Sequence, residues 1–170
     1  MHLHEEHKKQ APSSVACKVI TVSDTRTEET DKSGRQMKEM LQASGHEVAA
    51  YEIVTDEIIL IQQAVKAGLM DDGIQAVLVN GGTGLAMRDI TIEAVTPLFD
   101  KEIPGFGELF RYLSYTEDIG SAAMMSRAVA GTAGRTAVFS TPGSTGAVKL
   151  AMEKLILPEL GHVIRELNKD

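Results

Sequence analysis

The feature that most constrains the fold is an alternation of short, β-branched apolar segments with longer segments of helical periodicity. Cys17–Val22, Ala76–Val79 and Thr136–Ser140 are short apolar runs, as expected of strands that are covered on both faces. Strands that alternate with helices are typical of βαβ units, in which a parallel sheet carries helices on both sides. The sequence therefore predicts one α/β domain with three layers, α/β/α, around a mostly parallel sheet.

Further elements are predicted between and after these strands. We expect a strand at His46–Val54 and helices at Gly34–Ala43, from Ile58 onward, at Thr91–Leu98, at Val148–Leu157 and around Leu160–Leu167. Pro158 is expected to end the helix before it. Residues 101–125 show no clear period and are expected to be irregular, and Ser126-Arg127 to begin or interrupt a helical stretch.

The first fourteen residues are polar, so we expect a flexible tail over residues 1–14 and a single domain over residues 15–170. His2, His4 and His7 could hold a stray transition metal, but nothing near them fixes a coordination geometry. A solvated tail is therefore the simpler interpretation, and no repeat or linker divides the remaining chain.

Charge and composition argue against several classes of protein. The formal net charge of −7 disfavours general nucleic-acid binding, and aromatic residues, at 4% without any tryptophan, offer few surfaces for base stacking. The single cysteine excludes an intramolecular disulfide framework. No apolar run approaches the roughly 18 residues of a membrane span, and no signal segment is evident. We expect a cytoplasmic protein without nucleic-acid or membrane partners.

Two glycine-rich loops follow predicted strands directly. Asn80–Gly84 (NGGTG) follows the strand at 76–79, and Pro142–Gly146 (PGSTG) follows the strand at 136–140 and precedes a helix. Glycines let backbone N–H groups approach an anion, and ligands of parallel sheets bind beyond the carboxyl ends of the strands. Each loop could also be a plain tight turn. Because two such loops share one sheet edge, we favour phosphate binding, although neither loop is a P-loop or a dinucleotide fingerprint.

Two aspartates are expected at the same edge. Asp56 follows the strand at 46–54, and Asp89, beside Arg88, follows the first glycine loop. A carboxylate beside a phosphate is repulsive unless Mg²⁺ bridges the two, so the pair suggests metal-assisted phosphoryl or nucleotidyl transfer. Each aspartate could instead cap the helix that follows it, and spacing alone does not decide between these roles.

Other polar residues have simpler explanations. Ser23, Asp24 and Asp31 follow the first strand and could contact a polar ligand, but on their chemistry alone we favour capping of turns. Glu108 and Arg111 form a charge pair on one predicted turn, which is typical of a solvated surface.

Seven segments carry a resemblance to a known family. They are TVSDTR (21–26), DKSG (31–34), VTDE (54–57), NGGTG with the following RDIT (80–91), PGFGELFR (104–111), SRAVAG (126–131) and TPGS (141–144). With these segments the chain resembles the MoaB/MogA group of molybdenum cofactor biosynthesis proteins, which is similar to the G domain of plant Cnx and of gephyrin. The segments span nearly the whole chain after the tail and look most like the MoaB branch.

The resemblance implies a function. It implies a molybdopterin-binding α/β/α domain that assembles as a homo-oligomer, a trimer or a hexamer. Adenylylating members of the family are nucleotidyltransferases that use Mg²⁺ and ATP to transfer AMP to the terminal phosphate of molybdopterin. The alternative is a non-catalytic member that binds or carries molybdopterin, and other molybdenum cofactor biosynthesis proteins are expected partners. The Met-rich stretch from Met124 is a candidate apolar interface.

The resemblance also implies site residues, and it favours a functional Asp56 over a helix cap. Asp56 and Asp89 would be the catalytic and metal-binding carboxylates. The cofactor-binding set would consist of Gly81, Gly82, Thr83, Gly84, Gly143, Ser126, Ser144, Glu108 and Ser23. Within this set, the glycines of the first loop would line the nucleotide phosphates, Ser126 and Ser144 would contact pterin and phosphate, and Glu108 would help to close the pocket.

Overall fold

The structure is a computed structural model that describes residues 5–6 and 9–170. His2, His4 and His7 lie outside the described residues. Within the described part, no helix combines the length and apolarity that a membrane crossing requires.

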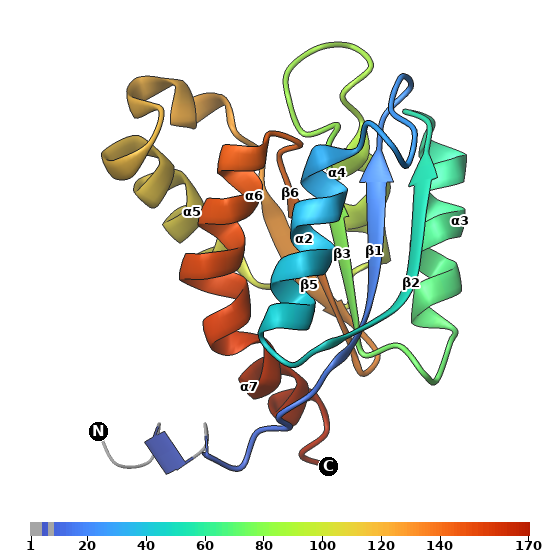
Figure 1. Cartoon of the computed structure of the whole chain (residues 1–170), viewed down its shortest axis with the longest axis vertical. Helices are drawn as coiled ribbons and strands as arrows, with labels where there is room; N and C mark the ends of the chain where they lie inside the picture. Colours follow the sequence, from blue (N-terminus) through green and yellow to red (C-terminus); the bar gives the residue numbers. More distant parts are fainter. Residues whose placement is uncertain (1–4, 7–8) are drawn as a thin grey trace.

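A mixed sheet forms the centre of the molecule (Figure 1). Across the described residues the strand order is β2-β1-β3-β6-β5-β4; β2, β1, β3 and β6 pair in parallel, whereas β5 is antiparallel to β6 and β4 to β5. The predicted mostly parallel sheet is therefore confirmed. The strands are β1 (Ala16–Val22), β2 (Glu47–Val54), β3 (Ala76–Asn80), β4 (Lys101–Glu102), β5 (Val129–Ala133) and β6 (Thr136–Thr141).

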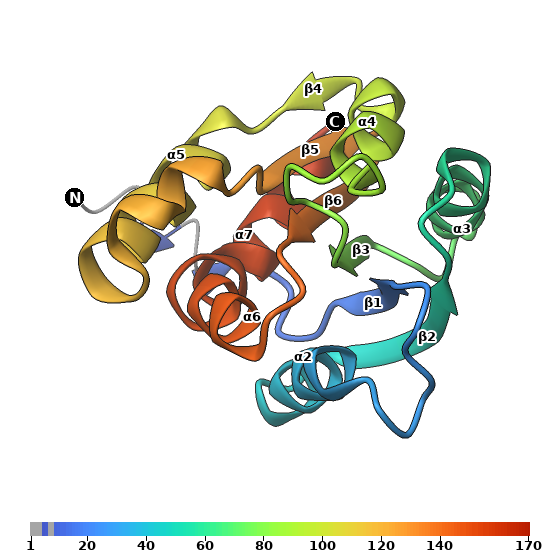
Figure 2. The ribbon, with the colours of Figure 1, turned by 90° about the horizontal axis from the view of Figure 1, so that it is seen from above.

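Helices cover both faces of the sheet and give the predicted three layers (Figure 2). On one face the buried side chains of α2, α5, α6 and α7 pack on the sheet, and on the other those of α3 and α4. The helices are α2 (Lys32–Ala43), α3 (Ile58–Leu69), α4 (Thr91–Val95), η1 (Thr96–Leu98), α5 (Pro104–Glu117), η2 (Gly120–Met125), α6 (Thr145–Ala151), η3 (Met152–Ile156) and α7 (Leu157–Leu167).

Residues 101–125 are not irregular, and that prediction is wrong. Most of the segment forms β4, α5 and η2. Pro104 occupies the start of α5, where its missing N–H costs no helical hydrogen bond. Phe106 and Phe110 are one turn apart and buried against the sheet, so packing outweighs the low helix propensity of Gly105 and Gly107. Ser126 and Arg127 lie between η2 and β5 rather than in a helical stretch.

Pro158 does not end the C-terminal helix, which corrects a second prediction. The helical segments α6, η3 and α7 follow one another directly, and Pro158 lies in the first turn of α7. The preceding turn, Met152–Ile156, is a π-helix. Such a turn removes the need for the hydrogen bond that a proline N–H would otherwise supply.

Candidate functional site

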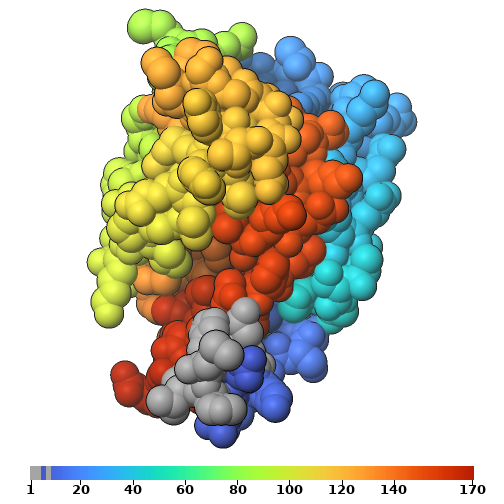
Figure 3. Space-filling model, turned by 90° about the vertical axis from the view of Figure 1, so that its left-hand side faces the viewer, coloured from blue at the N-terminus to red at the C-terminus, as the bar shows by residue number. Residues whose placement is uncertain are grey.

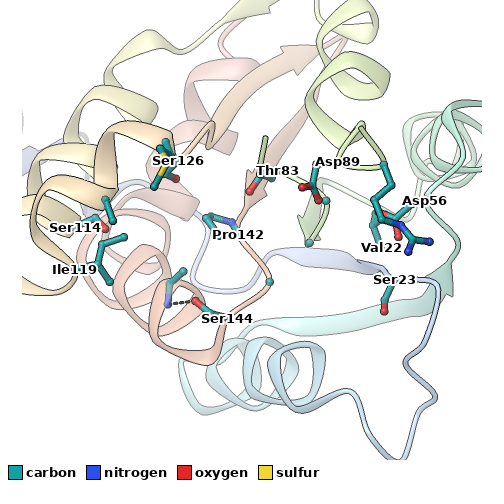
Figure 4. Close-up of a pocket in the computed structure, with 18 of the residues that line it drawn as sticks. Val22, Ser23, Asp56, Thr83, Asp89, Ser114, Ile119, Ser126, Pro142 and Ser144 are labelled. Atoms are coloured by element: carbon teal, nitrogen blue, oxygen red, sulfur yellow. Dashed lines mark hydrogen bonds between the residues drawn. The ribbon is translucent and has the colours of Figure 1, made fainter. Parts of the chain in front are cut away.

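A cavity of about 600 Å³ opens beyond the carboxyl ends of β1, β3 and β6 (Figure 4). Ten of the predicted site residues line it: Ser23, Asp56, Gly81, Gly82, Thr83, Gly84, Asp89, Ser126, Gly143 and Ser144. Glu108 lies on the exposed face of α5, outside this lining. Residues from five separate parts of the chain therefore meet at one edge of the sheet.

The first glycine loop has a backbone shape that requires glycine. Gly81 and Gly82 have φ angles of +98° and +67°, in the left-handed region. A Cβ atom on Gly81 would lie 2.3 Å from the carbonyl oxygen of Val22, and one on Gly82 would lie 2.2 Å from Thr91 Oγ1. The loop is thus wedged between the end of β1 and the start of α4.

The four carbonyl groups of this loop, Gly81–Gly84, all accept hydrogen bonds. Thr91 donates to the first two, from Oγ1 to Gly81 and from its backbone N–H to Gly82, at 2.8 and 2.9 Å. Arg127 donates to the next two, Thr83 and Gly84. Among the described residues, the N–H groups of Gly82, Thr83 and Gly84 have no hydrogen-bond acceptor. Consecutive N–H groups with this freedom are the donors that an anion needs.

The second loop touches the first. A Cβ atom on Gly143 would lie 3.1 Å from Gly81 Cα, so a larger residue would press the two loops apart. Ser144 caps α6, because its Oγ accepts a hydrogen bond from Ala147 N–H at 3.2 Å. Arg26 Nη2 donates to the Gly143 carbonyl at 2.9 Å and ties this loop to the end of β1.

Asp56 and Asp89 lie on the same side of the cavity, against the first glycine loop (Figure 4). Burial, and secondarily the charge of Asp89, raise the pKa of Asp56 above its ordinary value. Neither aspartate caps the helix that follows it: the N-cap positions are Glu57 for α3 and Ile90 for α4. The simpler alternative is therefore wrong for both residues, although Asp89 Oδ2 does accept a hydrogen bond from Ala86 N–H at 3.0 Å.

This carboxylate pair fits Mg²⁺. Half-buried carboxylates that repel each other are stabilised by a dication, and Mg²⁺ commonly takes one or two protein carboxylates together with water and phosphate oxygens. No cluster of three or more His, Cys, Asp or Glu side chains within the described residues could hold a metal ion by itself. Water and ligand phosphate oxygens would therefore complete the coordination.

Asp24, for which capping of a turn is the favoured interpretation from sequence, instead joins two of the loops. Asp24 Oδ1 accepts a hydrogen bond from Asp56 N–H at 2.9 Å, and Asp24 Oδ2 forms an ion pair with Arg88. The expected capping roles do hold for the two neighbouring residues: Ser23 accepts from Thr25 and Arg26 N–H, and Asp31 caps α2. Asp24 differs from these two residues in that its partners, Asp56 and Arg88, are distant in sequence, and only the folded structure identifies them.

A buried polar network supports the cavity floor. The Asp31 side chain is fully buried and lies beside Arg26 and Ser33. Burial by itself raises the pKa of Asp31, but hydrogen bonds from Thr21, Tyr51 and Gly34 and the charge of Arg26 lower it below its ordinary value. Asp31 thus stays ionised and fixes Arg26, which in turn holds the second loop.

The opposite end of the cavity is more apolar. It is lined by apolar side chains of Phe110, Ile119, Ala122 and Met125, by the hydroxyl groups of Ser114 and Ser126, and by one carboxylate, Asp118. Ser126 Oγ is buried and has no hydrogen-bond partner among the described residues. A buried hydroxyl without a partner is costly, so this end of the cavity suits a ligand with both an apolar face and polar edge atoms.

Comparisons with known proteins show which family the chain is similar to. Residues 18–162 match the family model described as "Probable molybdopterin binding domain". Molybdenum cofactor biosynthesis protein B of Bacillus subtilis (strain 168) is 69% identical over 166 residues, covering 98% of each chain. A crystal structure of a molybdenum cofactor biosynthesis protein B has a TM-score of 0.92 at 63% identity, covering 95% of this chain and 100% of that one. The tungsten cofactor synthesizing protein MoaB of Pyrococcus furiosus gives 0.77 at 40% identity, covering 92% and 99%.

Proposed function

Because the chain belongs to the MoaB/MogA family of molybdenum cofactor biosynthesis proteins, we propose that it is a molybdopterin adenylyltransferase. In this reaction an oxygen of the terminal phosphate of molybdopterin attacks the α-phosphorus of ATP. The bond between the α-phosphorus and the bridging oxygen breaks, and pyrophosphate leaves. The products are adenylylated molybdopterin and pyrophosphate, and no covalent bond to the protein is needed.

One observation carries the proposal: three consecutive N–H donors, which have no acceptor in the described part of the chain, lie beside two carboxylates that repel each other. The donors belong to Gly82, Thr83 and Gly84, and the carboxylates to Asp56 and Asp89. Donors alone would suit any anion. The carboxylates would oppose an anion unless a cation came with it, so the combination favours a Mg²⁺-bound polyphosphate over a simple phosphate or carboxylate.

The proposed mechanism depends on position and charge. The N–H groups of the first loop bind the phosphates of ATP and stabilise the negative charge on its leaving pyrophosphate. Asp56 and Asp89 are the residues that would hold Mg²⁺, which when bound neutralises phosphate charge. Ser144 stands on the second loop at the cavity wall, where its hydroxyl group can orient the molybdopterin phosphate for attack.

The pterin is assigned to the apolar end of the cavity. Its flat ring can pack on Ile119 and Met125, and a polar edge atom can pair with the buried hydroxyl group of Ser126. The phosphate of the pterin then points toward the glycine loops. We therefore propose that both substrates lie along this one cavity, with their reacting groups between Ser144 and Asp89.

Assembly into a homo-oligomer, a trimer or a hexamer, is part of the proposal. Exposed apolar side chains gather on α5 and η2, which cover the upper part of the face in Figure 3. Met124 is 84% exposed, and Leu109, Tyr112, Tyr115 and Ile119 are each at least half exposed. An apolar surface of this kind is typical of a contact between protein chains. The molar mass of the protein in solution, measured by light scattering, tests whether it forms such an oligomer.

The experiment that tests the enzyme is direct. Purified protein is incubated with molybdopterin, ATP and Mg²⁺, and adenylylated molybdopterin and pyrophosphate are measured, with an active family member as the positive control. Formation of both products in equal amounts supports the proposal. Tight binding of molybdopterin without AMP transfer would instead identify a carrier of molybdopterin.

A further inference from the structure

Arg127 lies between η2 and β5, outside the cavity lining, yet it contacts the first glycine loop from behind. Its Nε donates to the carbonyls of Thr83 and Gly84 at 3.2 and 3.0 Å. Its Nη2 donates to Gly84 and Asp89 at 2.7 and 2.9 Å, and its Nη1 pairs with the carboxylate of Glu93. One guanidinium group thus binds three backbone carbonyls of the same loop.

These contacts close the base of an exposed excursion. The chain leaves the cavity wall after Gly84 and returns to it at Arg88 and Asp89; between these points Leu85 is 67% and Met87 98% exposed. Arg127 binds the carbonyl on each side of the excursion, so it joins the two ends. The end at Gly84 carries the free N–H groups, and the end at Asp89 carries a carboxylate of the proposed metal site.

We infer that Arg127 is a positioning residue for the anion site: it holds the N–H donors and Asp89 in one fixed relation. A planar guanidinium can donate to several acceptors at fixed angles, which the compact ammonium of a lysine cannot. The inference rests on the proposed function in that the ligand is a phosphate bound with a divalent cation. It adds that one residue, which does not line the cavity, couples both halves of that site.

Glu93 on α4 sets the orientation of Arg127. A hydrogen bond from Arg127 is the main cause that lowers the pKa of Glu93, so this carboxylate stays charged beside the guanidinium. The side chains of Arg127 and Glu93 are 29% and 48% exposed. Water can therefore replace much of the hydrogen bonding when either is removed, and the expected loss is one of loop geometry more than of global stability.

The test measures binding of pyrophosphate in the presence of Mg²⁺ by calorimetry, without any turnover. Arg127→Gln is expected to weaken binding by about 10- to 100-fold, the effect of losing charge-assisted hydrogen bonds that hold the site together. Arg127→Lys should recover only part of the loss, because an ammonium group cannot reproduce the fork. Arg135→Gln is the matched control. Arg135 also donates a hydrogen bond to a main-chain oxygen, that of Asp170, but it lies in the turn between β5 and β6, at the end of the sheet away from the cavity.

A second measurement separates positioning from a general structural role. Hydrogen exchange of the amides of residues 82–89 should become faster in Arg127→Gln and in Glu93→Gln, while exchange in β1, β3 and β6 stays unchanged. The Mg²⁺ concentration that pyrophosphate binding requires should rise in the same variants, since Asp89 loses its anchor. If Arg127→Gln does not fold, Glu93→Gln carries the test, with an expected weakening of about 3-fold.

The outcomes distinguish this inference from the function on which it rests. If the unaltered protein binds pyrophosphate and Arg127→Gln binds it equally well, Arg127 has no positioning role and the proposed function stands. If the unaltered protein fails to bind Mg²⁺ and pyrophosphate, the proposed function fails, and local exchange at residues 82–89 still decides whether Arg127 fixes the loop. Exchange that increases throughout the sheet would overturn the inference.

Discussion

The two glycine loops end neighbouring strands and touch each other, yet they are constructed in different ways. In the first loop, Gly81 and Gly82 adopt left-handed φ angles. Every carbonyl from Gly81 to Gly84 accepts a hydrogen bond from Thr91 or Arg127, which leaves the N–H groups of residues 82–84 available to a ligand. In the second loop Gly143 has no left-handed angle, and the side chain of Ser144 consumes a helix N–H by capping α6.

This difference indicates different roles. The first loop is a rigid set of donors whose shape serves a ligand, because a turn between a strand and a helix needs neither two left-handed glycines nor a pinned row of carbonyls. The second loop begins α6 and forms part of the cavity wall, and Ser144 takes part in both, because it caps the helix and lines the cavity. Changes on the side of the first loop should therefore damage chemistry most, whereas changes in the second loop should act mainly through stability.

The largest effect is expected at the carboxylates beside the first loop. Asp89→Asn removes a charge that would hold Mg²⁺ and should lower the rate of adenylylation by about 10³-fold. The affinity for molybdopterin should change little, because the pterin is assigned to the far end of the cavity. Product formation and pterin binding, measured on the same preparation, check this.

Glu57→Gln is the control for that substitution. Glu57 is an exposed carboxylate next to Asp56 and does not line the cavity. Its neutralisation should leave the adenylylation rate within about 2-fold of the unaltered protein. If Asp89→Asn kept full activity, the Asp89 carboxylate would only stabilise the loop, and the proposed difference in function between the two loops would be wrong.

The second prediction compares a glycine from each loop. Gly81→Ala places a Cβ against the Val22 carbonyl in a left-handed backbone, and should cost at least about 2 kcal/mol of unfolding free energy and most of the pyrophosphate binding. A Cβ in Gly143→Ala would lie no closer to its described neighbours than 3.1 Å, from the Gly81 Cα, and the substitution should cost about 1 kcal/mol. Gly105→Ala, whose Cβ meets no atom of the described residues within 4 Å, should be neutral or stabilising. Urea denaturation measures all three variants, and equal losses at Gly81 and Gly143 would contradict the distinction.

Much of this site could be predicted from the sequence because it depends on local patterns. Continuous apolar runs identified β1, β3 and β6, and the loops that follow such strands must share one edge of a parallel sheet. The antiparallel strand β5 was missed: it is short, and its sequence VAGTA is made largely of small residues whose burial depends on the neighbouring β6.

The contacts that organise the loops could not be predicted in this way. Arg127 meets Gly84 across 43 positions of sequence, and Asp24 meets Asp56 across 32. A charged residue in an irregular segment has no periodicity that would indicate its partner, so only the folded chain identifies Arg127 and Asp24 as parts of the site. Helix α5 was missed for another reason: Phe106 and Phe110 have helical spacing, but Gly105 and Gly107 weaken the pattern, and packing on the sheet outweighs them.

A smaller effect is expected for the cap of the second loop. Ser144→Ala removes the acceptor for Ala147 N–H and should lower the unfolding free energy by about 1 kcal/mol, as loss of an N-cap usually does. Ser144→Asp restores an acceptor and should restore the stability, but it should weaken binding of the molybdopterin phosphate because it adds a negative charge. Thermal unfolding and pterin binding separate the two roles, and unchanged stability in Ser144→Ala would show that the cap contributes nothing.

The smallest expected effect is a gain in stability rather than a loss, and it concerns Asp56, beside the first loop. Burial and the charge of Asp89 raise the pKa of Asp56, so the carboxyl contributes stability below its ordinary pKa of 3.8 and loses that contribution as the pH rises through the raised value. At pH 7 without Mg²⁺, Asp56→Asn should therefore be more stable than the unaltered protein, by less than about 1 kcal/mol because the side chain is partly solvated. The gain should disappear near pH 3, where Asp56 is protonated, whereas the loss in Ser144→Ala should persist at both pH values. Urea denaturation at the two pH values measures this.

The two outcomes have different meanings. If Asp56→Asn is more stable at pH 7 but no longer binds pyrophosphate with Mg²⁺, the carboxylate of Asp56 serves the chemistry and not the fold. If Asp56→Asn is less stable at pH 7, Asp56 supports the fold, and the repulsion between the two aspartates cannot be the reason that Mg²⁺ binds there.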